Sequence, residues 1–200
     1  MTDVHRAGKT ARLTGTAILA ALVIVFDYAL KFSGLKIPFP WMPFLKFDFT
    51  GVPIVVALLL FGLSSAATTS VVASLGIVAR SGDLIGGAMK GIAELSTVAG
   101  MAAGLHLAER ISPSREIRMA GALAVGVATR ILVMSAWNLL VLPNFYGVPF
   151  NATIGMLPLL ALFNAMQGAM TVVLGYTLHK TYLRRVPTQD RSVPSLSPRP

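Results

Sequence analysis

Two sets of polar side chains lie inside apolar stretches of this chain, and the first set is charged. It comprises Asp27, Lys90, Glu94 and Arg130. A charge at membrane depth is energetically unfavourable, so each is a candidate functional residue. Lys90 and Glu94 are four residues apart, which on a helix lets them neutralise each other, and Glu94 or Asp27 could pair with Arg130. Structural ion pairs that hold helices together explain these charges as well as ligand binding does.

The second set is uncharged and lies in the last third of the chain. Trp137 and Asn138 precede an aromatic segment, PNFYGVPFN, while Asn164 and Gln167 are one helical turn apart. Carboxamides both donate and accept hydrogen bonds without carrying charge, which suits a heteroaromatic ligand with amide-like edges. The alternative is that Asn and Gln hydrogen-bond neighbouring helices as packing contacts.

The sequence shows no arrangement typical of an enzyme or a metalloprotein. It has no Ser/His/Asp set, no carboxylate pair within one segment and no HExxH motif, so we assign no catalytic residue. The three histidines are scattered without ligand spacing, and the chain has no cysteine. We therefore expect no metal site, no cofactor and no enzymatic activity of its own.

The composition indicates that membrane-spanning elements position these side chains. The chain has 200 residues, 54% of them hydrophobic and only 12% charged, and its mean hydropathy is +0.71. A soluble domain carries about 25% charged residues. The net charge of +9 is concentrated at the ends of apolar runs rather than along one face. This pattern indicates a protein of the lipid bilayer and argues against a nucleic-acid partner.

We predict an all-α integral membrane protein, a compact bundle of six transmembrane helices. The second and third spans are short and separated only by a weak break at 62–66, so five spans are the alternative. The predicted organisation is an N-terminal segment at 1–12, a membrane domain at 13–183 with spans at about 13–32, 52–65, 66–80, 85–108, 119–142 and 153–182, an outer loop at 33–51, and a disordered tail at 184–200.

The placement of basic residues predicts that both termini are cytoplasmic. With six spans, the cytoplasmic segments hold Arg6, Lys9, Arg12, Arg110, Arg115, Arg118, Lys180, Arg184, Arg185, Arg191 and Arg199. The outer segments hold only Lys31, Lys36, Lys46 and Arg80. This asymmetry follows the positive-inside rule for proteins of the cell membrane.

The segment LKFDFTGVP at 45–53 alternates apolar and polar residues before the second span. We expect a short extended lid in which Phe47 and Phe49 face the ligand or the bundle, while Lys46 and Asp48 face water. Thr50 is a candidate cap for the helix that follows. The alternative is a surface turn whose aromatic residues anchor at the membrane interface.

Small residues recur at four-residue spacing on several predicted helices. The pairs include Ala17 and Ala21, Gly87 and Gly91, Gly100 and Gly104, and the series Ala120, Ala124 and Ala128. This spacing lets helix backbones approach closely, and most instances are expected to serve packing inside the bundle.

Four stretches together resemble the substrate-binding S component of an energy-coupling factor (ECF) vitamin transporter, most closely the riboflavin-specific branch. They are LKFDFTGVPIVVALLLFG, GGAMKGIAELSTVAGMAAG, WNLLVLPNFYG and PLLALFNAMQGAMTVVLGYTLHK. Their order and spacing cover most of residues 13–183.

The resemblance implies a vitamin site near the outer face, under the loop that joins the first two helices. It implies ligand contacts from Asn138 and Asn164, and we add Gln167, Phe47, Phe49, Glu94 and Trp137 as candidate binding residues. In the riboflavin branch a lysine is expected where this chain has Gln167, which leaves a related heteroaromatic vitamin as an alternative to riboflavin.

The resemblance also implies partner chains. An ECF transmembrane subunit would dock against Ala17 and Ala21 on the first helix, and two separate ATPase subunits would hydrolyse ATP. The alternatives are a non-transport membrane scaffold of similar fold, a small membrane enzyme and a self-sufficient vitamin carrier.

Overall fold

The computed structural model describes residues 8–110 and 114–185. Most of the predicted N-terminal segment and of the predicted tail therefore lie outside the described residues. The elements are, in order, α1 (Lys9–Phe32), β1 (Ile37–Phe39), β2 (Met42–Phe47), α2 (Gly51–Phe61), α3 (Leu63–Ser81), α4 (Leu84–Glu109), α5 (Arg115–Phe145) and α6 (Phe150–Arg185). The prediction of a helical bundle is confirmed.

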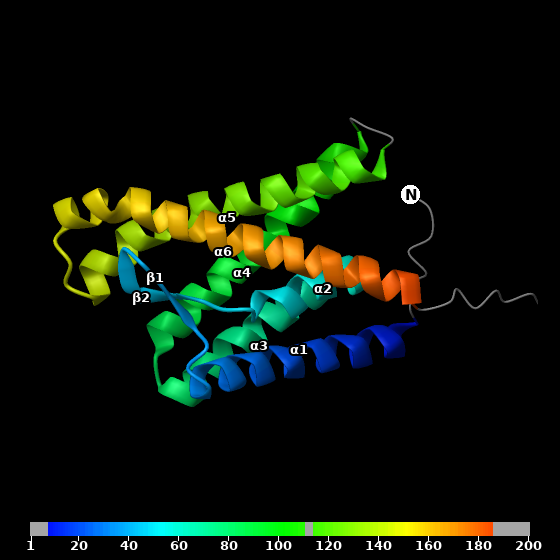
Figure 1. The fold of residues 1–200 in the computed structure, drawn as a ribbon, viewed down its shortest axis with the longest axis horizontal. Coiled ribbons are helices and arrows are strands. Elements are labelled where there is room, and N and C mark those ends of the chain that lie inside the picture. Colours follow the sequence, from blue (N-terminus) through cyan, green and yellow to red (C-terminus); the bar gives the residue numbers. More distant parts are fainter. Residues whose placement is uncertain (1–7, 111–113, 186–200) are drawn as a thin grey trace, which may run out of the picture.

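The helices run back and forth along one long axis (Figure 1). The start of α1, the end of α4, the start of α5 and the end of α6 lie at one end of the molecule. The α3–α4 turn and the α5–α6 loop lie at the other end, and the β1–β2 hairpin lies on that side of the bundle. We call these the basic end and the hairpin end.

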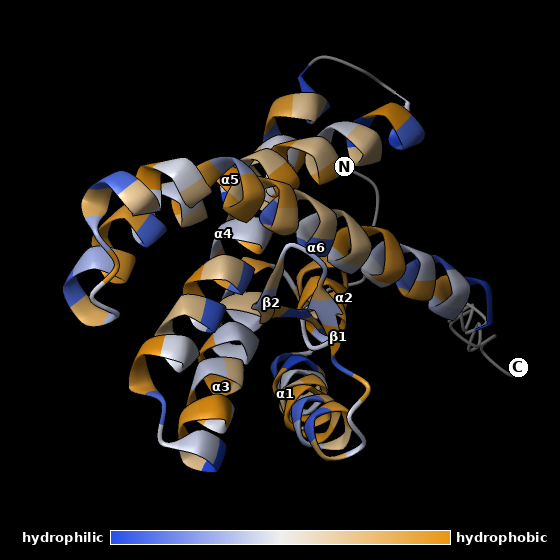
Figure 2. Cartoon of the chain, turned by 60° about the vertical axis from the view of Figure 1, so that its left-hand side comes forward, coloured by the Kyte–Doolittle hydropathy of each residue, from blue (hydrophilic) through white to orange (hydrophobic). Residues whose placement is uncertain are grey.

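Five helices are long and apolar enough to cross a membrane: α1, α3, α4, α5 and α6. Hydrophobic residues cover much of their length, while hydrophilic residues gather towards the ends of α5 and α6 (Figure 2). This supports the predicted membrane location.

Helix α2 differs from the other helices in length and burial. Its 11 residues span about 16 Å, too short to cross a hydrocarbon core of about 30 Å. It is buried on nearly all sides, and Val55, Ala57 and Leu58 join the central core. Gly62, with φ +88°, separates α2 from α3, in the region where the sequence predicted a weak break. The six-span count stays a prediction.

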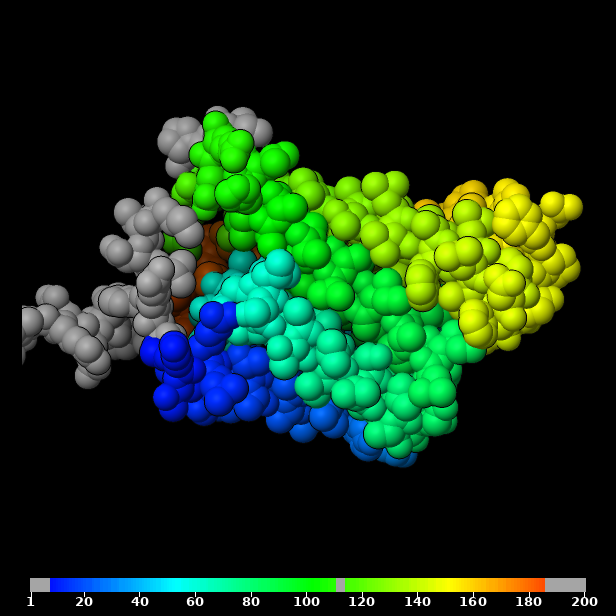
Figure 3. Space-filling model, turned by 180° about the vertical axis from the view of Figure 1, so that it is seen from behind, coloured from blue at the N-terminus to red at the C-terminus, as the bar shows by residue number. Residues whose placement is uncertain are grey.

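The face seen in Figure 3 is formed by neighbouring helices α1, α3, α4 and α5. Helix α6 packs against α5 and α2 from the opposite side. The central core, which includes Val23, Ile54, Val98, Met101 and Val172, lies between these layers. Helix α2 thus lies inside the bundle and contacts most of the other helices.

Close packing between α4 and α5 depends on glycines at the predicted four-residue spacing. A Cβ atom at Gly100 would lie 2.5 Å from Oγ1 of Thr129, and one at Gly104 would lie 2.8 Å from Cα of Ala122. The missing side chains therefore allow the two helices to touch.

We expect Gly104→Ala to lower the free energy of unfolding by about 1–3 kcal/mol, because the added methyl group meets backbone that cannot rotate away. Gly121→Ala is the matched control, since its Cβ would find only Ala108 Cβ at 3.9 Å. That control should be neutral, or up to about 1 kcal/mol more stable through its higher helix propensity. Denaturant titration in detergent micelles measures both changes, and equal effects would contradict close α4–α5 packing.

Candidate functional site

A chain of buried ion pairs connects α4 and α5 in the interior of the bundle. Nζ of Lys90 lies 2.7 Å from Oε1 of Glu94, as the four-residue spacing predicted. Nη1 of Arg130 lies 3.1 Å from the same Glu94 oxygen. Glu94 is fully buried and Arg130 is 2% exposed. Arg130 therefore pairs with Glu94 and not with Asp27, the other partner considered from the sequence.

The same chain of contacts reaches the loop between β2 and α2. Nζ of Lys90 lies 2.8 Å from Oδ1 of Asp48. That oxygen also accepts hydrogen bonds from the hydroxyl of Thr50 at 2.6 Å and from its backbone N–H at 3.1 Å. Thr50 occupies the N-cap position of α2, but its hydroxyl bonds Asp48 instead of capping the helix. Two carboxylates and two cations balance one another, so the network carries no net charge.

The prediction that Asp48 faces water is wrong. Asp48 is 9% exposed and points into the bundle, whereas Lys46 is exposed as predicted. The alternation of the loop ends at Phe47, because the backbone must turn inward to start the buried helix α2. Lys90 and Thr50 then provide the partners that a buried carboxylate requires.

Gln167 of α6 holds this loop through its backbone. Its Nε2 donates to the carbonyl oxygen of Asp48 at 2.8 Å, and its Oε1 accepts from the Asp48 N–H at 3.3 Å. Nε2 also lies 3.3 Å from Oγ1 of Thr171. Gln167 is 1% exposed. The base of the hairpin is therefore fixed to α6 by a carboxamide and to α4 by an ion pair.

The environment of Asp48 shifts its protonation strongly. Burial disfavours the charged carboxylate, but Lys90, the hydrogen bond from Thr50 and the charge of Lys36 outweigh it and lower the pKa of Asp48 from 3.8 to about 2. A carboxyl group whose pKa is lowered by folding stabilises the folded state above its unfolded pKa. That stabilisation is lost as pH falls towards the folded value.

We expect Asp48→Asn to be less stable than the unmodified chain by an amount of the order of 2 kcal/mol at neutral pH. The gap should be constant down to about pH 4 and shrink between pH 4 and 2, as the unmodified carboxylate becomes protonated. Thermal unfolding of both proteins in detergent across this range measures it. A gap that stays constant to pH 2 would contradict the ion pair.

Asn164 and Asn138, the other two carboxamides predicted for the site, have different surroundings. Oδ1 of Asn164 accepts a hydrogen bond from Nε of Arg130 at 3.2 Å, which joins Asn164 to the network. Asn138 is buried two turns further along α5, and its Nδ2 donates to the carbonyl oxygen of Met134. The structure thus brings Glu94, Asn164 and Gln167 into one connected network, with Asn138 nearer the hairpin end.

An aromatic cluster lies on the hairpin side of this network. The ring centroids of Phe47 and Phe163 are 5.1 Å apart, those of Phe39 and Phe163 are 5.6 Å apart, and Trp41 contacts Phe39 at 5.2 Å. Phe39 is completely buried. Phe47 therefore faces the bundle, which is one of the two orientations we predicted, and Phe49 is half-buried.

Two buried polar atoms near these groups lack a hydrogen-bond partner among the described residues. One is Oε2 of Glu94, which packs against Gly51 at the start of α2. The other is Nε1 of Trp137, the residue before Asn138. A donor and an acceptor left unsatisfied inside a protein are destabilising, so groups of this kind are candidates for ligand or water contacts.

Asp27, the remaining charged candidate, belongs to a separate cluster at the hairpin end. Its two carboxylate oxygens lie 2.6 Å from Nζ of Lys36 and 2.7 Å from Nε of Arg80. It does not contact Arg130. This cluster ties the segment before β1 to α3, which makes its role one of holding the loop in place.

The predicted partner-binding residues lie on the surface of the bundle. Ala17 and Ala21 are exposed on α1, next to the exposed side chains of Leu13, Ile18 and Val25. An apolar face with small residues is compatible with close approach of another helix.

Sequence reasoning missed Asp48 and Phe163 as members of the site. Asp48 follows an alternating segment that points it outward, so its inward turn had no sequence signal. Phe163 directly precedes Asn164, and this position next to a predicted site residue could have indicated that Phe163 belongs to the site. In chemical terms the site contains aromatic rings and carboxamides, and the amide of Asn164 is bonded within the protein, with Nδ2 donating to the carbonyl oxygen of Leu160 at 2.9 Å and Oδ1 accepting from Arg130. Among the described residues, no group of three or more acidic, His or Cys side chains is placed to hold a metal ion.

Comparison with known proteins identifies the architecture. No model of a known protein family matches the sequence, and no curated protein matches it. Among solved structures, that of the S component of a bacterial ECF transporter superposes with a TM-score of 0.72 over 88% of this chain and 97% of that chain, at 22% sequence identity. The chain has the fold of an S component. The S-component fold agrees with the helical membrane bundle predicted from the sequence, and it leaves the ligand open.

Proposed function

We propose that this chain is the substrate-capture subunit of an ECF-type importer in the cell membrane, with riboflavin or a related heteroaromatic vitamin as ligand. One observation carries the proposal: in an S-component fold, the hairpin is fixed at its base over a buried, charge-balanced network that includes Glu94, Asn164 and Gln167. Aromatic rings on the hairpin side supply stacking surfaces, and carboxamides supply hydrogen bonds. Asn138, Trp137, Phe47 and Phe49 complete the proposed site.

The proposed orientation places the basic end in the cytoplasm. The start of α1 and the end of α6 lie there together, so both termini would be cytoplasmic, and the ligand would enter from the hairpin end. Helix α2 would lie in the second of the six predicted spans, with the loop at 33–51 on the outer side.

In the proposed mechanism this chain captures the ligand, and other subunits supply the energy for its release. The ligand binds under the hairpin, which opens and closes about its fixed base at Asp48. The loaded subunit docks through Ala17 and Ala21 on an ECF transmembrane subunit and tilts in the membrane. Two ATPase subunits then supply the energy that releases the ligand inward, so this chain itself would not be an enzyme.

We expect Asn164→Ala to weaken vitamin binding by more than about 1 kcal/mol, roughly fivefold or more in Kd, because a buried ligand group would lose its amide partner. Quenching of riboflavin fluorescence on titration with the purified chain measures this. Asn144→Ala is the matched control, since Asn144 is exposed at the end of α5 and its Nδ2 donates to the carbonyl oxygen of Leu140 in the same helix. Equal affinities in the two variants would exclude Asn164 from the site.

Reconstitution in liposomes distinguishes the proposal from a self-sufficient carrier. The chain alone should bind vitamin without accumulating it, and accumulation should require an ECF transmembrane subunit, two ATPase subunits and ATP. Uptake by the chain alone would overturn the proposal in favour of the carrier.

One observation favours a non-transport scaffold instead. Phe39, Met42, Leu160 and Phe163 are packed and buried beneath the hairpin. A scaffold needs no space there, whereas a capture subunit must move these side chains to admit a ligand. Absence of vitamin binding would favour the scaffold.

A further inference from the structure

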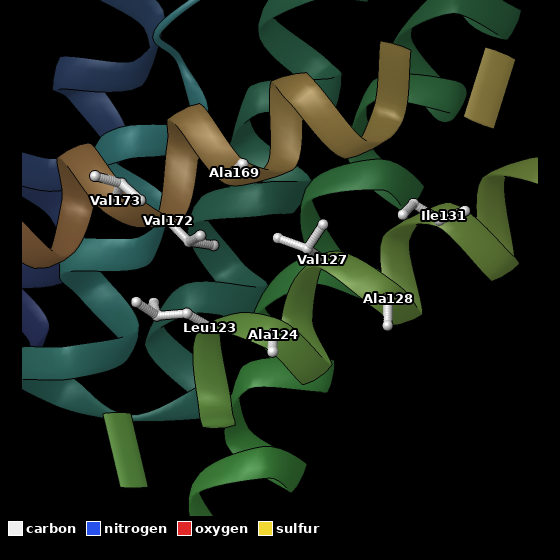
Figure 4. A pocket seen from close by; sticks show the side chains of 8 residues that line it. All are labelled: Leu123, Ala124, Val127, Ala128, Ile131, Ala169, Val172 and Val173. Carbon is white, nitrogen blue, oxygen red and sulfur yellow. The ribbon is translucent and has the colours of Figure 1, made fainter. Parts of the chain in front are cut away.

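An open apolar groove with a volume of about 430 Å³ lies between α5 and α6, outside the network described above. Ala124, Val127 and Ala128 line it from α5, and Ala169 and Val173 line it from α6 (Figure 4). Three of these five side chains are methyl groups, which leaves the surface hollow between the helices.

The groove lies a short distance from a group of cations contributed by both helices. Arg115 is eight residues before Leu123 at one end of the lining, and Lys180 is seven residues after Val173. At 1.5 Å per residue, these cations lie about 10–12 Å beyond the groove. The basic residues at this end of α5 and α6 are Arg115, Arg118, Lys180, Arg184 and Arg185, accompanied by the single carboxylate of Glu116.

A second observation points to a ligand at this end. His179 of α6 is 6% exposed, and its Nδ1 has no hydrogen-bond partner among the described residues. Arg115 lies close enough to His179 to interact with it electrostatically, which brings the two helix ends together. The helix ends beyond the groove thus carry both positive charge and an unsatisfied ring nitrogen.

We propose that the groove holds an acyl chain of an anionic phospholipid whose phosphate lies among these cations. The lining extends along α5 from Leu123 to Ile131, a rise of about 12 Å, which is close to one leaflet of a hydrocarbon core about 30 Å thick. A transmembrane helix of a partner would need a surface of the full thickness. Anionic lipids are concentrated in the cytoplasmic leaflet, where the proposed orientation places the basic end.

The test is native mass spectrometry of the purified full chain in detergent, titrated separately with phosphatidylglycerol and phosphatidylcholine. We expect one phosphatidylglycerol to bind at least tenfold more tightly than phosphatidylcholine. Filling the groove with Ala124→Leu and Ala169→Leu should abolish this preferred site. Ala136→Leu is the matched control, an exposed alanine on α5 outside the groove, and it should retain the preference.

A second variant tests the headgroup contacts without altering the groove. Arg115→Gln with Lys180→Gln, both exposed, should bring the affinity for phosphatidylglycerol down to that for phosphatidylcholine. Equal affinity of the unmodified chain for the two lipids would overturn the proposal. So would unchanged lipid preference after filling the groove, or conversion of a dimer to a monomer by the filled variant, which would assign the groove to a second copy.

Discussion

Arg130→Met is expected to lower the free energy of unfolding by about 3–5 kcal/mol. The substitution fills a similar volume but leaves Glu94, which is fully buried, with Lys90 as its one ionic partner among the described residues. Removing one member of a buried ion pair is strongly destabilising, because the remaining charge stays in a region of low dielectric constant. Unfolding in mixed detergent micelles measures the loss.

Two further variants test whether the loss of stability comes from the buried ion pair. Arg118→Met removes a cation from the same helix at its partly exposed start and should change stability by less than about 0.5 kcal/mol. Combining Arg130→Met with Glu94→Gln removes the excess negative charge from the network, so part of the lost stability should return. If Arg130→Met were as stable as Arg118→Met, the buried pair would not hold α4 and α5 together.

The second large effect is expected at Gln167. In Gln167→Leu, the N–H and carbonyl oxygen of Asp48 both lose their side-chain partner in a buried position. Each unsatisfied group is destabilising by about 1–3 kcal/mol, so for the two groups together we expect a loss of about 2–6 kcal/mol. Because the base of the hairpin would be released, vitamin affinity should fall at least about tenfold. Calorimetric titration and thermal unfolding measure the two effects.

Gln167→Glu separates the two hydrogen bonds, since a carboxylate can accept from the Asp48 N–H but cannot donate to its carbonyl oxygen. It should be intermediate between the unmodified chain and Gln167→Leu in stability. Asn144→Leu, at an exposed position, should leave stability and binding unchanged. Loss of binding in Gln167→Leu without loss of stability would show that Gln167 contacts the ligand rather than fixing the loop.

The helical architecture could be predicted from the sequence because apolar runs and their breaks determine it. The glycine pair Gly100 and Gly104 has the close contacts that its spacing predicts. The pairing of Lys90 with Glu94 is a local contact within one helix, so it too could be predicted. Patterns within a single helix were therefore reliable, whereas the alternation of the loop at 45–53 was wrong at Asp48.

Contacts between segments that are far apart in the sequence were harder to predict. Gln167 and Asp48 are 119 residues apart, and nothing in either segment specifies that a side-chain amide of α6 pairs with loop backbone. The inward turn of Asp48 depends on Lys90, which belongs to another helix. For the same reason the sequence could name Asp27 as a buried charge without naming Lys36 and Arg80 as its partners.

Capture of a heteroaromatic vitamin under the hairpin can be measured by isothermal titration calorimetry of the purified chain with a panel of vitamins that includes riboflavin. We expect one heteroaromatic member to bind with a stoichiometry of one, and we expect Asn164→Ala to weaken this binding while Asn144→Ala does not. No binding across the panel would contradict capture of a vitamin by this chain.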